Sequence, residues 1–224
     1  MILVFDLDNA LYDELSYVHS GFRAVAKHIS RTYHQNYDKI FRRLCDVEKG
    51  MVRGKTFNAV LDEIGIKSKN SVKKCLNVYR AHDPKICLHQ DADLCLKRFK
   101  HLPLYIVTDG NKIVQRKKIR ALRLGKRIVH SYITHLYGLR NAKPSPFCFL
   151  KICERQRVRP NEVIYVADNP LKDFVGIKPL GFRTIRILQG PYSTTKVALS
   201  HDAHVRIRSL NQITESLLDR LVHA

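Results

Sequence analysis

The chain has 224 residues, of which 45% are hydrophobic and 27% are charged, as in an ordinary soluble globular protein. This length suits one domain, or one domain with an insert, and no apolar run is long enough to span a membrane. The formal net charge of +20 favours an anionic partner, although general surface basicity also accounts for it. No basic segment precedes the first apolar run, so we expect a cytoplasmic protein.

The first dozen residues combine a buried strand with two acids. Ile2 to Phe5 is a continuous apolar run, which is typical of a strand in a parallel sheet. Asp6 and Asp8 follow it, and residues two apart on an extended chain point the same way. An acidic turn is the simpler interpretation. Two like charges repel, however, unless a proton or a cation lies between them, and Mg²⁺ prefers oxygen ligands.

The next part of the chain, from Asp13 to about Gln90, carries no strand signal. Apolar residues recur there with a helical period in four segments, which are Ser16 to Ser30, Tyr37 to Val47, Thr56 to Ile64 and Ser71 to Tyr79. This block is too long for a simple crossover between two strands. It predicts an α-helical cap domain, residues 14–90, inserted into a core domain formed by residues 1–13 and 91–224.

After Ala92, strand and helix signals alternate. The strand signals are Leu104 to Val107, Ile128 to Thr134, Val163 to Ala167, Phe182 to Leu188 and Val205 to Ile207. The helix signals are residues 94–99, 113–124 and 146–155, a short segment from Leu171, and residues 210–221. Such alternation predicts an α/β fold with a Rossmann-like three-layer core and a parallel sheet, joined by right-handed crossovers.

The helix expected at residues 113–124 contains a basic run from Gln115 to Arg120. As a helix, it can turn Ile113, Val114 and Leu122 toward the sheet, which leaves the cations on a solvated face. A nucleic-acid patch is the alternative, but no aromatic residues interleave with the cations for base stacking.

Six cysteines are scattered along the chain without a C-x-x-C pair. This spacing argues against a zinc site, and a disulfide framework is not typical of a chain of this size. Apolar neighbours, such as those of Cys148, indicate reduced and packed thiols.

Polar side chains stand at the ends of three predicted strands. They are Asp6 and Asp8, Thr108 and Asp109, and Asp168, and Lys143 lies on the loop before the fourth strand. If the strands are parallel, these groups share one edge of the sheet, where ligands bind in α/β proteins. Carboxylates, a hydroxyl and an amine around a metal suit phosphoryl transfer through an aspartyl phosphate.

These residues stand in four motifs whose order and spacing resemble the haloacid dehalogenase (HAD) superfamily of phosphatases. The motifs are Asp6-Leu7-Asp8, Ile106-Val107-Thr108-Asp109-Gly110, Lys143-Pro144, and Val166-Ala167-Asp168 with Asp173. The match runs from Met1 to about Leu188, and it points to the branch with a helical cap between the first two motifs, subfamily I. Ala10 and Ala167 depart from the family pattern, and neither removes a reacting group.

The resemblance implies a Mg²⁺-dependent phosphatase of a small phosphorylated metabolite, with Asp6 as nucleophile and Asp8 as general acid and base. Thr108 and Lys143 would also be catalytic. The phosphoryl group would be bound by Thr108, Asp109, Gly110 and Lys143. By the same resemblance, Mg²⁺ would be held by Asp6, the backbone carbonyl of Asp8, and Asp168, with support from Asp173.

A second hypothesis comes from another class of protein. The chain could keep the HAD fold with little turnover and bind nucleic acid or an acidic partner, which the charge of +20 and Ala10 motivate. Such binding should weaken steeply with salt. We expect no membrane partner, and neither the oligomeric state nor the particular phosphorylated substrate follows from the sequence.

Overall fold

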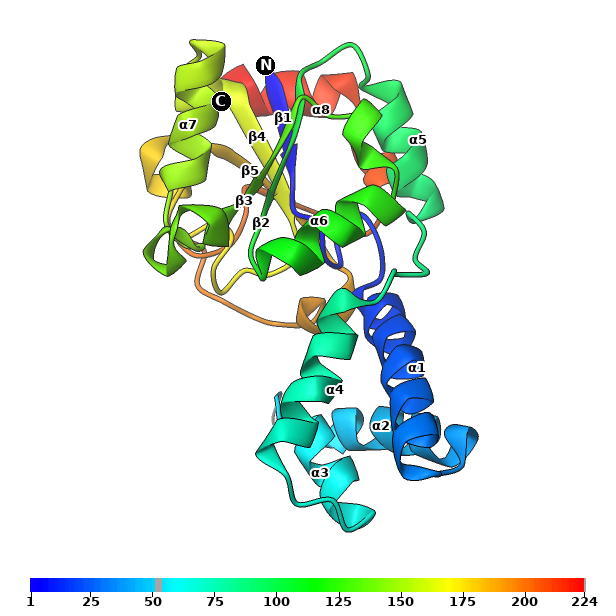
Figure 1. Ribbon diagram of the computed structural model, residues 1–224. Coiled ribbons are helices and arrows are strands. Elements are labelled where there is room, and N and C mark those ends of the chain that lie inside the picture. The colour runs from blue at the N-terminus through cyan, green and yellow to red at the C-terminus, as the bar shows by residue number, and fades with distance from the viewer. Residues whose placement is uncertain (51–53, 224) are drawn as a thin grey trace. The chain divides into compact units, whose positions relative to one another are not determined.

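The computed structural model describes residues 1–50 and 54–223 (Figure 1). The chain divides into two compact units, one formed by Met1–Glu14 with Cys87–Ala224 and the other by Leu15–Ile86. No helix among the described residues is long and apolar enough to cross a membrane.

The first unit is built on a six-stranded sheet in which every pairing is parallel, with the strand order β3-β2-β1-β4-β5-β6. The strands are β1 (Ile2–Phe5), β2 (Leu104–Thr108), β3 (His130–Ile133), β4 (Val163–Ala167), β5 (Arg183–Ile187) and β6 (Val205–Ile207). The apolar run at the start of the chain thus forms a central strand, and the predicted α/β class with a parallel sheet is confirmed.

The strand register explains where the polar residues meet. Phe5 pairs with Ile106 on one side and with Val166 on the other. The residues that follow these three positions therefore leave the sheet at the same edge, because the strands are parallel. All residues of β1, β2 and β4 are buried, so the register is fixed by apolar side chains on both faces.

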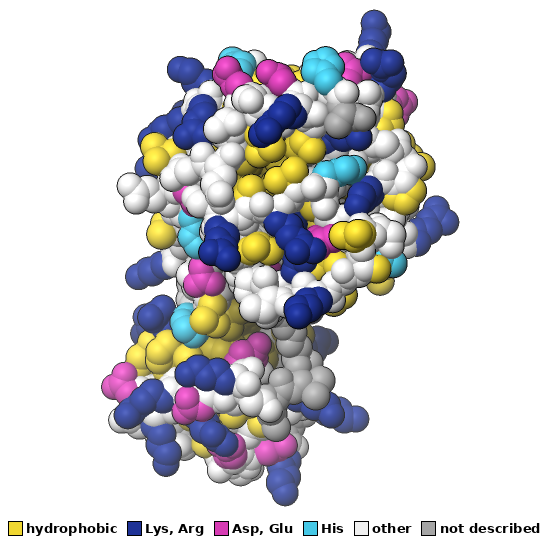
Figure 2. All heavy atoms as spheres, turned by 180° about the vertical axis from the view of Figure 1, so that it is seen from behind, with side chains coloured by type: hydrophobic (Ala, Val, Ile, Leu, Met, Phe, Trp, Pro, Cys, Tyr) yellow, Lys and Arg dark blue, Asp and Glu magenta, His cyan; other side chains and the backbone are white. Residues whose placement is uncertain are grey.

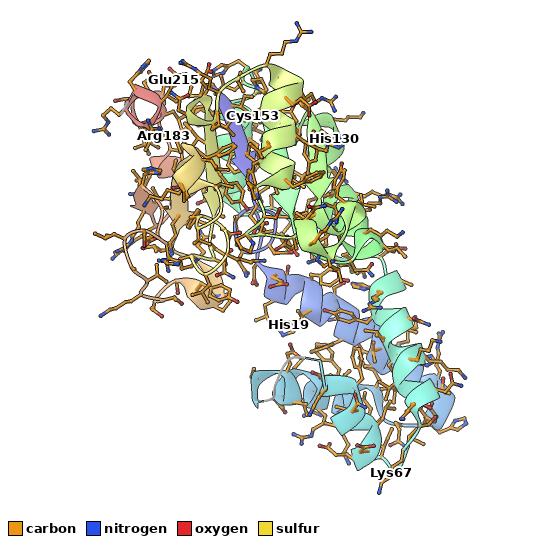
Figure 3. The ribbon with its side chains drawn as sticks, turned by 90° about the vertical axis from the view of Figure 1, so that its left-hand side faces the viewer. His19, Lys67, His130, Cys153, Arg183 and Glu215 are labelled. Carbon is orange, nitrogen blue, oxygen red and sulfur yellow. The ribbon has the colours of Figure 1, made fainter. Side chains whose placement is uncertain are left out.

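Helices cover both faces of this sheet (Figure 1). On one side lie α5 (Gln90–Arg98) and α6 (Lys112–Ala121), and on the other lies α7 (Phe147–Gln156). Phe149 and Cys153 of α7 pack in one apolar cluster with Tyr105, Val107 and other strand residues. Cys153 is labelled in Figure 3, where α7 faces the viewer. The final helix is α8 (Glu215–His223).

The second unit is helical throughout its described part. Its helices are α1 (Glu14–Tyr33), α2 (Tyr37–Gly50), α3 (Thr56–Glu63) and α4 (Lys69–Ala81). Apolar residues at helical spacing form its own core, in which Phe22 and Val25 of α1 meet Leu44, Val60 and Cys75. Burial of this amphipathic face, rather than helix propensity alone, stabilises such short helices.

Three details of the sequence interpretation are wrong. The segment from Leu171 forms turns and a single 3-10 turn at Lys178–Leu180 instead of a helix, because Asp173 accepts a hydrogen bond from the Asn169 N–H, and Pro170 and Pro179 lack a backbone donor. The last helix begins at Glu215 and not at residue 210, since Ile213 takes an extended conformation. The third error concerns α6 and is described with the site. All six cysteines are free, as expected.

Candidate active site

The parallel sheet brings the polar residues of four loops to one edge. Asp6 follows β1, Thr108 ends β2, and Asp168 follows β4. Lys143 reaches the same place from the loop before α7, where its ammonium group lies 3.1 Å from an Asp6 carboxylate oxygen. The structure therefore brings together Asp6, Lys143, Asp168 and Asp173 from the motifs, but not the side chain of Asp8.

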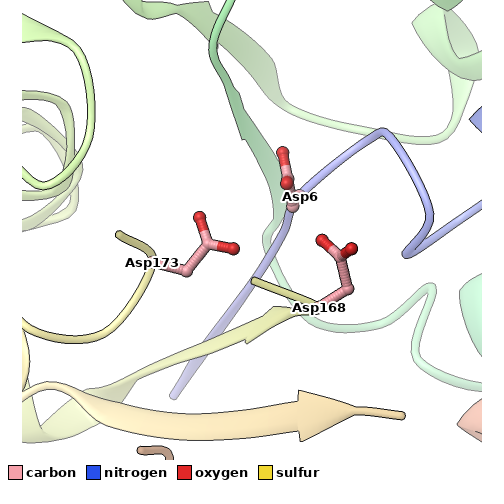
Figure 4. A group of neighbouring side chains, drawn as sticks. All are labelled: Asp6, Asp168 and Asp173. Atoms are coloured by element: carbon pink, nitrogen blue, oxygen red, sulfur yellow. The ribbon is translucent and has the colours of Figure 1, made fainter. Parts of the chain in front are cut away.

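Three buried carboxylates converge beside the end of β1 (Figure 4). One oxygen from each of Asp6, Asp168 and Asp173 lies within 4.8 Å of the other two. Asp168 Oδ2 is buried without a hydrogen-bond partner. Burial, together with the neighbouring charges of Asp6 and Asp173, raises the pKa of Asp168 from 3.8 to about 8. Crowded carboxylates with an unsatisfied oxygen are a donor set that could hold a divalent cation.

Asp6 itself is held from two sides. Its Oδ1 accepts a hydrogen bond of 2.8 Å from the Leu7 N–H, and its Oδ2 faces the Lys143 ammonium group. Burial raises the pKa of Asp6 to about 6, and Lys143 opposes that rise. The Asp6 carboxylate is thus oriented before any substrate arrives.

Lys143 neutralises several acids at once. Its ammonium group lies 2.7 Å from Asp173 and donates a 2.9 Å hydrogen bond to the Tyr165 hydroxyl. Burial alone would lower the pKa of Lys143, but Asp173 and Asp6 raise it well above its usual value. A permanently charged amine at this point can meet a phosphoryl oxygen.

The Asp109 carboxylate contacts three other residues of the site. Its Oδ1 accepts from the Thr134 hydroxyl at 2.7 Å and from the Lys143 N–H at 3.1 Å, and its Oδ2 pairs with Lys172 at 2.8 Å. Burial opposes ionisation, but Lys143 and Lys172 hold the pKa of Asp109 at about 2. Since this carboxylate is ionised and cannot donate to a phosphate, any phosphate contact of Asp109 must come from its backbone N–H.

Asp8 lies in a separate polar cluster. Its Oδ1 is 2.7 Å from the Lys118 ammonium group and accepts from the Tyr12 hydroxyl, and its Oδ2 accepts from Gln115 at 2.9 Å. Burial alone would raise the pKa of Asp8, yet Lys118, Tyr12 and Gln115 together lower it below its usual value. The Asp8 side chain therefore stands apart from the three converging carboxylates.

The sequence analysis assigned no role to six side chains that contact this site: Tyr12, Gln115, Lys118, Thr134, Tyr165 and Lys172. The expectation for α6 was right for Leu122, which is buried, but wrong for Ile113, which is 52% exposed, and for the cations, since Lys118 is buried. Gln115, Lys118 and Leu122 follow the i, i+3, i+7 spacing of one helix face, and that spacing was the available signal. The polar side chains point inward because Asp8 and Thr108 are there to pair with them.

The two departures from the family motifs lie in packed positions. Ala10 and Ala167 are both fully buried. Neither side chain carries a polar group, so the acids, the hydroxyl and the amine of the site are all retained.

Comparison with known proteins adds the family context. A family model described as haloacid dehalogenase-like hydrolase matches residues 1–181. A glyceraldehyde 3-phosphate phosphatase from Methanocaldococcus jannaschii is 28% identical over 204 residues, which cover 85% of this chain and 86% of that one. One from Pyrococcus furiosus is 34% identical over 112 residues, so there the match spans only about half of either protein, 50% of this chain and 46% of the relative.

Solved structures share the fold at low sequence identity. A 2-haloacid dehalogenase from Pseudomonas syringae superposes with a TM-score of 0.66 at 18% identity, covering 99% of this chain and 97% of its own. A structure described as a putative beta-phosphoglucomutase from Thermotoga maritima gives 0.63 at 19% identity, covering 100% and 99%.

Proposed function

This chain belongs to the haloacid dehalogenase-like hydrolase family, and we propose that it is a phosphatase that transfers the phosphoryl group of a phosphomonoester first to Asp6 and then to water. One observation carries the proposal most directly. The Asp6 carboxylate is fixed between the Leu7 N–H and the Lys143 ammonium group, beside the acids of Asp168 and Asp173. An oriented carboxylate next to positive charge is what attack on an anionic phosphoryl group requires.

The reaction proceeds in two displacements. An Asp6 oxygen forms a bond to phosphorus while the bond from phosphorus to the ester oxygen breaks, and the departing alkoxide takes a proton from the protonated form of Asp8. Water then attacks the phosphorus of the aspartyl phosphate, gives its proton to the Asp8 carboxylate, and releases inorganic phosphate and Asp6. The ionised form of Asp8, which Lys118 favours, is the form that accepts this proton.

Two side chains of the site would bind the phosphoryl oxygens. Lys143 supplies a positive charge, and the Thr108 hydroxyl supplies a hydrogen-bond donor. Gly110 has a φ of +131°, which favours glycine and lets the backbone approach closely.

Mg²⁺ would be held by Asp6, the backbone carbonyl of Asp8, and Asp168, with Asp173 nearby, and when bound it supplies positive charge that offsets the carboxylates and the phosphoryl oxygens. The unpartnered Asp168 Oδ2 and the raised pKa of that residue support this assignment.

The helical unit Leu15–Ile86 is proposed to act as the cap that selects the substrate and excludes water. The substrate is a small phosphorylated metabolite. Glyceraldehyde 3-phosphate is the first compound to test, since relatives that match most of this chain carry the name of a phosphatase of that compound.

Phosphate release by the wild-type protein and by Asp6→Asn tests the proposal. With Mg²⁺ and either p-nitrophenyl phosphate or glyceraldehyde 3-phosphate, we expect Asp6→Asn to lose about 10³-fold or more of the turnover, because the amide is not a nucleophile. Asp62→Asn, an exposed acid of the helical unit, is the matched control and should keep wild-type rates. Wild-type turnover in Asp6→Asn would show that the nucleophile is wrongly assigned.

A further inference from the structure

Two polar residues of α6 are buried although the helix is strongly basic. Gln115 is 1% exposed and Lys118 is 3% exposed. They are three residues apart and so share one face of the helix. Long polar side chains are rarely this buried unless they are paired. Their partners are the side chains of Asp8, two residues after Asp6, and Thr108, at the end of the strand that pairs with β1.

Gln115 bridges these partners with one nitrogen atom. Its Nε2 lies 2.6 Å from Thr108 Oγ1 and 2.9 Å from Asp8 Oδ2. The Gln115 atom facing Asp8 is the amide nitrogen, which only donates, so the Asp8 oxygen accepts this hydrogen bond. That nitrogen has two hydrogens, one for each partner, and the Thr108 oxygen is consequently an acceptor.

The direction of this bond matters for Thr108. A hydroxyl group has one hydrogen, and a hydroxyl that accepts from Gln115 keeps its hydrogen for another acceptor. In the proposed phosphatase reaction, that acceptor would be an oxygen of the phosphoryl group.

Asp8 is fixed by the same helix. Lys118 holds its Oδ1 at 2.7 Å while Gln115 holds its Oδ2. Both carboxylate oxygens are thereby constrained, and the side chain cannot rotate without breaking one of these contacts.

We propose that Gln115, with Lys118, is a positioning residue that turns the hydroxyl hydrogen of Thr108 toward the phosphoryl group and keeps Asp8 in place beside it. This inference rests on the proposed phosphatase function. The buried face of α6 would thus align the Thr108 hydroxyl and the Asp8 carboxylate. This role is distinct from those of the nucleophile and the metal ligands.

The test compares Gln115→Leu and Gln115→Met with the wild-type protein. Both variants remove the shared donor, and Gln115→Met keeps the length of the side chain without adding a charge beside Asp8. We expect kcat/KM to fall about 10- to 100-fold, less than the roughly 100- to 1,000-fold cost of deleting a donor outright. Arg116→Gln, an exposed neighbour on α6, should stay within about twofold.

A double-mutant cycle with Thr108→Val separates alignment from general structural support. If Gln115 acts partly through the Thr108 hydroxyl, the fold-loss of kcat/KM in the double variant will be smaller than the product of the losses in Gln115→Leu and Thr108→Val. Binding of orthovanadate, which needs no turnover, should weaken in Gln115→Leu and weaken little further when Thr108→Val is added.

The outcomes distinguish this inference from the phosphatase assignment. Folded Gln115 variants with wild-type kcat/KM and wild-type vanadate affinity would overturn it. So would a double variant whose loss of kcat/KM equals the full product of the losses in Gln115→Leu and Thr108→Val. If Gln115→Leu does not fold, Gln115→Met decides the question. Failure of the phosphatase assignment would appear instead as undiminished turnover in Asp6→Asn.

Discussion

At the level of single residues, the site combines several buried acids with one buried amine that neutralises part of their charge. Lys143 is surrounded by the carboxylates of Asp6, Asp173 and Asp109, and it makes direct ion pairs with the first two. Asp168 is outside these ion pairs and keeps an unpartnered oxygen. One buried amine thus offsets several acids, and the remaining negative charge is what would attract a cation.

The stability of the metal-free protein should depend on pH because of Asp168. Its pKa is raised from 3.8 to about 8 by folding, so the folded protein holds a proton that the unfolded chain releases. The stabilisation is complete below the unfolded pKa of 3.8 and is lost as the pH rises toward 8. Because of this group, the midpoint of thermal unfolding in EDTA should be lower near pH 8 than near pH 5.

Mg²⁺ should raise the unfolding midpoint more near pH 8 than near pH 5, because at low pH the cation must displace protons. Asp168→Asn removes the titrating group and is the control, in which most of this difference should disappear. An equal effect of Mg²⁺ at both pH values would contradict the metal site.

At the level of elements, the sheet and the second unit were the most predictable parts. Continuous apolar runs such as Ile2–Phe5 and Val163–Ala167 are typical of buried strands, and each is followed by an acid that motif spacing also identifies. The inward face of α6 was not predicted, because hydrophobic periodicity places a lysine such as Lys118 on the solvent-exposed face of a helix. Its burial depends on a tertiary partner, Asp8, that lies 110 residues earlier.

Two loops of the site depend on the absence of a side chain at Gly176. A Cβ at that position would lie 1.7 Å from the carbonyl oxygen of Pro144. The loop after β4 is therefore packed directly against the backbone that carries Lys143. Gly176→Ala must displace one of the two loops, so we expect at least tenfold lower kcat/KM, as from misplaced catalytic groups, and a lower unfolding midpoint.

Gly125→Ala is the matched control for this prediction, since a Cβ there meets nothing within 4 Å. It should leave both activity and the unfolding midpoint near the wild-type values. If Gly176→Ala behaves like Gly125→Ala, the two loops are not coupled as the structure indicates.

At the level of the whole molecule, the net charge of +20 is not explained by one patch. Figure 2 shows Lys and Arg scattered over the face in view, with fewer acids between them. Such a distribution attracts small anions from all directions. The nucleic-acid alternative stays a prediction, because dispersed cations without interleaved aromatics give no defined binding surface.

This charge predicts a salt effect on catalysis. Raising KCl from about 20 to 200 mM should lower kcat/KM for an anionic phosphomonoester by about threefold or more, since screening weakens the attraction of the substrate. The value of kcat should change little. Sucrose at equal osmolality is the control, and a kcat/KM that is independent of salt would show that the charge plays no part in substrate capture.

The most direct test of the account is to trap the phosphoenzyme. The wild-type protein is mixed with ³²P-labelled substrate, quenched in acid within the first turnover, and digested for peptide mapping. The account predicts a hydroxylamine-sensitive label on the peptide that contains Asp6, and no label in Asp6→Asn. Steady turnover by the wild-type protein with no label on that peptide, or with label on another residue, would contradict it.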